Sequence, residues 1–60
     1  MNGKSYNLAC AYAMKKDKGN ALRYLSEALN NKEIKVSFVE DDEDWKFYKN
    51  DKEFINLLNK

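Results

Sequence analysis

Residues 6–29, YNLACAYAMKKDKGNALRYLSEAL, decide the fold of this chain. They hold two stretches of helical periodicity, separated by a Lys-Asp-Lys-Gly break at residues 16–19. Both stretches place Ala or Cys where a helical core would normally place Leu or Phe. Because helix axes approach more closely when the side chains between them are small, the pattern predicts two helices in tight contact.

The first helix is expected to run from about Lys4 to Lys16, with Asn2 as its N-cap. One face of this helix follows the i, i+3, i+4, i+7 spacing that predicts packing. The residues on that face are Ser5, Leu8, Ala9 and Tyr12. We expect this face to pack against the rest of the chain.

The second helix is expected to run from about Lys18 to Asn31, and Asp17 is its expected N-cap. Its apolar face also follows a helical period. The residues on this face are Ala21, Leu22, Leu25, Ala28 and Leu29. Because roughly two or three residues connect the two helices, they must be antiparallel neighbours.

The sequence changes character after Glu33. Residues 34–39 are apolar at alternate positions, a pattern that also occurs in β-strands, but we favour a short helix because an isolated strand has no partner in a helical chain. An acidic run follows at residues 40–44, and we interpret it as a solvated segment that initiates a helix. Trp45 and Tyr48, spaced i, i+3, are expected to anchor this region on the second helix.

The last helix is expected to begin after its N-cap, Asp51, and to end near Asn59. Its apolar face consists of Phe54, Leu57 and Leu58. The predicted fold class is therefore all-α: an antiparallel helix-turn-helix hairpin followed by a short C-terminal capping segment and a terminal helix. We expect a single domain, with residues 1–33 as the hairpin and residues 34–60 as the cap.

Composition argues against several classes of function. The chain has 60 residues, 43% of them hydrophobic and 35% charged, so it forms one domain at most. Its 11 Lys and Arg residues nearly balance 10 Asp and Glu residues, which gives no overall electrostatic case for binding nucleic acid or an anionic membrane. No apolar run approaches the roughly 18 residues of a membrane span.

The side chains that catalysis commonly uses are also missing. There is no histidine, the commonest general base and a frequent metal ligand, and there is no glycine-rich phosphate loop. We therefore expect no enzymatic activity and no cofactor. The single cysteine, Cys10, cannot form an internal disulfide, and this fits a cytoplasmic protein.

Six positions of the hairpin resemble the signature of the tetratricopeptide repeat at its usual spacing. They are Leu8, Ala9 and Tyr12 in the first helix and Ala21, Leu25 and Ala28 in the second. Other positions depart from the family pattern: Ser5 replaces the favoured Trp, Lys16 replaces the turn Gly, and Glu33 replaces the closing Pro. Residues 36–58 are similar to the segment that often follows the last repeat, which implies a degenerate repeat acting as a C-terminal cap of the helical superhelix.

The resemblance also implies a function. In this family the first helix of a repeat lines a concave groove that binds extended peptides. By position, the groove-facing candidates are Tyr6, Asn7, Cys10, Ala13 and Met14. We therefore expect a non-catalytic module for protein–protein interaction, a scaffold or adaptor, with a protein or peptide partner at these residues.

Four of these candidates form a stripe on the first helix, which we call the first-helix stripe: Tyr6, Cys10, Ala13 and Met14. We expect the cap to cover the second helix and to leave this stripe without a neighbour. An uncovered apolar stripe on so small a domain tends to mark a binding site. The prediction is that the isolated chain binds a partner, or associates with itself, through the first helix.

Other hypotheses stay open at this point. The chain could be a purely structural C-terminal cap of a larger repeat protein whose activity lies elsewhere, or a small helical regulator that dimerises. Cys10 as a reactive thiol lacks a neighbouring base, so we favour small helical filler. The acidic run at residues 40–44 lacks the spacing of an EF-hand loop, so no metal site is expected. Its charge also repels the phosphates of any nucleic acid that would stack on Trp45, Phe47 and Tyr48.

Overall fold

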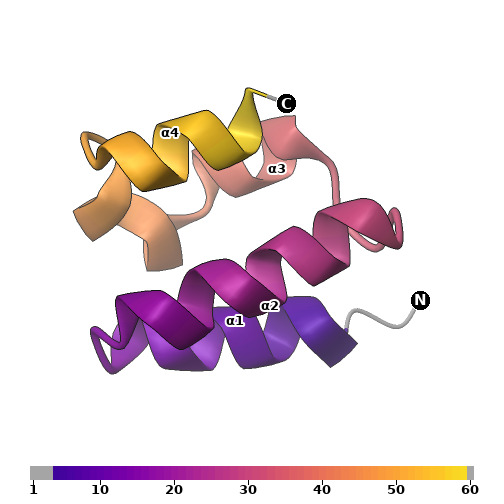
Figure 1. Cartoon of the computed structure of the whole chain (residues 1–60), viewed down its shortest axis with the longest axis horizontal. Helices are drawn as coiled ribbons and strands as arrows, with labels where there is room; N and C mark the ends of the chain where they lie inside the picture. The colour runs from indigo at the N-terminus through magenta and orange to yellow at the C-terminus, as the bar shows by residue number, and fades with distance from the viewer. Residues whose placement is uncertain (1–3, 60) are drawn as a thin grey trace.

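The computed structural model describes residues 4–59 of the chain. All regular secondary structure in this range is helical, as the sequence predicts, and the strand alternative is wrong. The elements are α1 at Lys4–Met14, α2 at Lys18–Asn30, α3 at Val36–Asp41, the 3-10 helix η1 at Glu43–Tyr48, and α4 at Lys52–Leu58. Figure 1 shows two layers, one formed by the antiparallel pair α1 and α2 and the other by the C-terminal elements.

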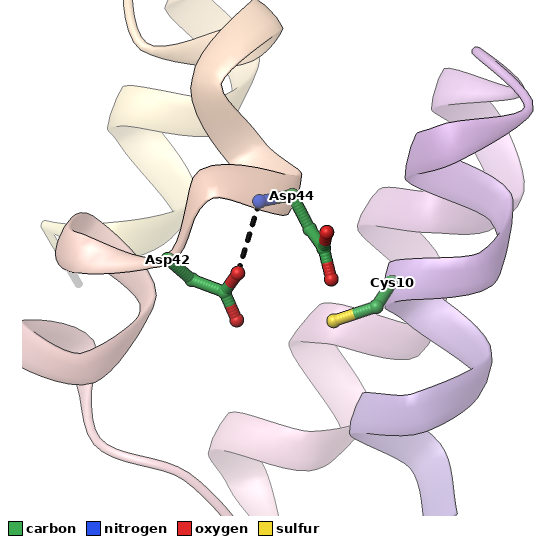
Figure 2. Close-up of side chains that lie close together, drawn as sticks. All are labelled: Cys10, Asp42 and Asp44. Atoms are coloured by element: carbon green, nitrogen blue, oxygen red, sulfur yellow. Dashed lines mark hydrogen bonds between the residues drawn. The ribbon is translucent and has the colours of Figure 1, made fainter.

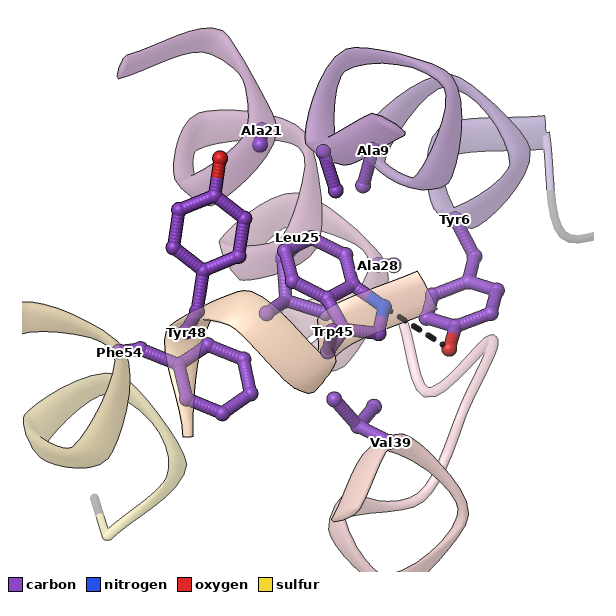
Figure 3. Close-up of a cluster of buried hydrophobic side chains, with 10 residues drawn as sticks. Tyr6, Ala9, Ala21, Leu25, Ala28, Val39, Trp45, Tyr48 and Phe54 are labelled. Carbon is purple, nitrogen blue, oxygen red and sulfur yellow. Dashed lines mark hydrogen bonds between the residues drawn. The ribbon is translucent and has the colours of Figure 1, made fainter. Parts of the chain in front are cut away.

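Small side chains hold the hairpin together. Ala9, Ala13, Ala21 and Ala28 have no exposed surface, and Figure 3 shows Ala9 and Ala21 where α1 and α2 face each other. Alanine loses no side-chain rotamer freedom on burial, so these positions let the two backbones approach at little entropic cost. The predicted antiparallel pair of helices is therefore present.

Both long helices end in the same backbone motif. Lys16 and Lys32, the residues that follow them by two positions, adopt left-handed φ values of 63° and 60°. After α1, the N–H of Lys16 donates to the carbonyl of Ala13 at 3.0 Å, and the N–H of Asp17 donates to the carbonyl of Tyr12 at 2.9 Å. The same two bonds close α2 around Lys32. This is the Schellman motif, in which glycine usually takes the left-handed position, and it ends α1 two residues earlier than predicted.

Side-chain caps set the start of two C-terminal elements. Asp42 Oδ1 accepts from the N–H of Asp44 at 2.9 Å, at the start of η1. Asp51 Oδ1 accepts from the N–H groups of Glu53 at 2.9 Å and Phe54 at 3.2 Å, at the start of α4. These bonds satisfy amides that have no partner within the helix. The predictions that the acidic run initiates a helix and that Asp51 caps the last helix are confirmed.

The core lies between the two layers. Trp45, Leu25 and Val39 are the largest side chains with no exposed surface. The ring of Trp45 stacks on that of Phe54 with centroids 5.5 Å apart, and the Tyr48 ring lies 6.0 Å away. Figure 3 shows this aromatic group beneath the hairpin, with Leu25 of α2 beside the indole. The C-terminal region is therefore anchored on the hairpin by its aromatic side chains, as expected.

Some local predictions need correction. Leu8, expected on the packed face of α1, is 46% exposed. Asp17 takes the N-cap position of α2, but its side chain makes no capping hydrogen bond; its Oδ2 accepts from Nδ2 of Asn20 at 3.0 Å instead. The short helix expected at residues 34–39 begins only at Val36. The predicted cap Asn2 lies outside the described residues.

The left-handed conformation of Lys32 leads to a prediction about stability. The left-handed conformation destabilises a residue that has a Cβ by about 1–2 kcal/mol. Glycine avoids this strain, but its more flexible unfolded chain lowers stability by about 0.5–1 kcal/mol. Lys32→Gly should therefore raise the free energy of unfolding by about 0.5–1 kcal/mol. Urea denaturation followed by circular dichroism measures the change.

Lys49→Gly is the matched control, because Lys49 follows η1 with an ordinary helical φ of −57°. This exposed lysine gains nothing from glycine, so its replacement should lower the free energy of unfolding by about 0.5–1 kcal/mol. If both variants lose stability equally, the left-handed backbone at Lys32 is not a source of strain.

Candidate functional site

The first-helix stripe, where we expected a partner to bind, is mostly covered. Tyr6 is 7% exposed, Ala13 is fully buried, and Cys10 is half-buried. Asn7 is exposed, and Met14 is exposed to 69%. The expectation that the stripe has no neighbour is therefore wrong for Tyr6, Cys10 and Ala13, whereas Asn7 and Met14 are accessible.

The cover comes from η1, which packs against α1. Trp45 Nε1–H donates to the hydroxyl oxygen of Tyr6 at 3.1 Å, and the two ring centroids lie 6.4 Å apart. The ring of Phe38 in α3 makes a T-shaped contact with the Tyr6 ring, and their centroids lie 6.2 Å apart. We predicted a cap on the second helix alone, but the indole reaches both helices. A peptide could occupy the stripe only by displacing these side chains.

Tyr6 forms the centre of a chain of hydrogen bonds that joins α1 to the start of η1. Its hydroxyl donates to Asp42 Oδ2 at 2.7 Å while it accepts from Trp45. Burial, and then the hydrogen bond to Asp42, hold the pKa of Tyr6 well above its usual range. Within residues 4–59, no buried side-chain nitrogen or oxygen lacks a hydrogen-bond partner. The chain of bonds is therefore satisfied and favours one arrangement of the two layers.

Cys10 lies beside the same carboxylates. Figure 2 shows its thiol directed from α1 toward Asp42 and Asp44 at the start of η1. The sulfur and one oxygen of each carboxylate all lie within 4.8 Å of one another. Burial, followed by the negative charges of the two aspartates, raises the pKa of the Cys10 thiol to about 11. The thiol is therefore protonated at neutral pH and is a poor nucleophile.

This pKa shift also has a consequence for stability. The folded value, about 11, lies above the ordinary value of 9.0. The folded state therefore favours the protonated thiol. The protonated Cys10 thiol therefore contributes fully to the stability of the fold below about pH 9, and this contribution is lost as the pH rises through about 11.

The cluster of Cys10, Asp42 and Asp44 does not fit a metal centre. A structural zinc site uses thiolate and imidazole ligands in a set of four, whereas the cluster offers three residues, two of them carboxylates. Both oxygens of Asp42 already accept hydrogen bonds, from Tyr6 and from the N–H of Asp44. The arrangement is explained by the contact between α1 and η1.

A second surface, which the sequence pattern does not predict, lies on another side of α1. Leu8 is 46% exposed. Residues two positions apart in a helix point about 200° apart, so Leu8 faces away from the side of α1 on which Tyr6 packs against η1. Tyr12 lies one turn further along, and its ring stacks on that of Tyr24 of α2 at 5.6 Å, with an interplanar angle of 3°. Both tyrosines are half-buried. We call Leu8, Tyr12 and Tyr24 the open hairpin face.

The open hairpin face is bordered by charged side chains. Lys4 and Lys15 lie at i−4 and i+7 from Leu8, on its side of α1, and both are exposed. Arg23 of α2 places its guanidinium carbon 5.7 Å from the centre of the Tyr24 ring. Carboxylates lie beside these cations, because Glu33 Oε1 accepts from the N–H of Ser5 at 3.1 Å and Glu27 Oε2 from its hydroxyl at 3.3 Å. The face therefore combines an aliphatic side chain and a stacked aromatic pair with a border of both charges.

Comparison with known proteins does not assign the chain to a family. No family model matches it, and neither a curated protein nor a solved structure matches it. Among the described helices, none has both the length and the apolar character needed to cross a membrane. The tetratricopeptide resemblance therefore rests on the sequence pattern alone.

The hydroxyl group of Tyr6 leads to a second prediction. Tyr6→Phe keeps the ring but leaves the buried Trp45 Nε1–H without its acceptor, which should lower the free energy of unfolding by about 1–3 kcal/mol. Tyr12→Phe is the matched control. The Tyr12 ring contributes by stacking, which the variant keeps, so the free energy of unfolding should fall by less than about 0.5 kcal/mol. Urea denaturation of both variants decides the point, and equal losses would count against the proposed role of the Tyr6 hydroxyl.

Proposed function

We propose that this chain is a non-catalytic module for protein–protein interaction, of the tetratricopeptide type, and that a partner docks on the open hairpin face. The observation that carries the proposal is the exposure of Leu8 beside the stacked pair Tyr12 and Tyr24. Aromatic and aliphatic side chains that stand together on a small domain are typical of docking surfaces. The reducing environment of the cytoplasm is the compartment that we propose for a chain with one cysteine.

Three features support the proposed repeat type. The hairpin is antiparallel, its crossing is lined with alanines, and the turn places Lys16 in the left-handed conformation that glycine favours. The repeat pattern expects glycine at that position, so the backbone conformation agrees with the pattern although the residue differs.

The proposed docking surface differs from the one that the resemblance implies. The first-helix stripe is covered through Tyr6, Cys10 and Ala13, so an extended peptide in that groove is not part of the proposal. Asn7 and Met14 are exposed, but helix geometry directs them away from Tyr12. Self-association through the first helix stays a prediction, and Met14 is the residue of the first-helix stripe that is exposed.

A second candidate function is the structural cap of a larger repeat protein. The C-terminal layer covers one side of the hairpin, while Leu8 on another side is exposed. A terminal repeat needs one such covered side and one side that receives the preceding repeat. In this case a preceding repeat of the same polypeptide would cover the open hairpin face.

Photo-crosslinking at position 8 tests the proposal. Leu8→p-benzoylphenylalanine, in cells that produce the protein, should give a discrete covalent adduct with another protein on irradiation. The same residue at the exposed position of Lys49, in the C-terminal layer, is the control and should give no such adduct. Equal labelling from the two positions, or none from position 8, would overturn the docking function. An adduct confined to one longer polypeptide would favour the structural cap.

A further inference from the structure

We draw no further inference here: the strongest candidate, the partner of the open hairpin face on α1 and α2, carries nothing beyond the proposed function, because this face is bordered by side chains of both charges and nothing in the structure shows what covers it.

Discussion

The burial of one indole holds the two layers of this protein together. Trp45 has no exposed surface, and its ring contacts those of Tyr6 on α1 and of Phe54 on α4. Its single polar atom is satisfied by the Tyr6 hydroxyl. A hairpin whose crossing is made of alanines buries little apolar area, because each methyl group is small. The large aromatic side chains of the C-terminal layer supply the area that the hairpin lacks.

This arrangement also explains which surfaces are available for function. The indole and the Tyr6–Asp42 bond close the first-helix stripe and leave Cys10 half-buried with a raised pKa. Lys18 pairs with Asp51 at 3.0 Å and with Glu53 at 2.8 Å, which links α2 to α4 at the surface. Such exposed pairs add little stability. The C-terminal layer is therefore used to complete the core, and Leu8 lies on a side of α1 that this layer does not cover.

Periodicity and capping signals predicted the helices well because both are local. Asp51 marks the start of α4 through bonds to residues two and three positions away, and the sequence contains all of that information. The cover over Tyr6 was missed because it depends on Trp45, 39 positions further along the chain. A helical pattern shows which residues share a face, but not which distant side chain lies over it. Lys16 was noted as a departure from glycine, and only the backbone shows that it takes the glycine conformation.

The central claim is that Trp45 holds the two layers together, and thermal unfolding of Trp45→Ala tests it most directly. Loss of a buried Trp side chain costs about 3–5 kcal/mol, and a domain of this size is stable by something on the order of 3–9 kcal/mol. The control is Phe47→Ala, which removes an aromatic ring from the same helix, where Phe47 is 73% exposed. Far-UV circular dichroism should show no cooperative transition, or one at a much lower temperature, for Trp45→Ala and a parent-like transition for Phe47→Ala. Parent-like melting of Trp45→Ala would contradict the account.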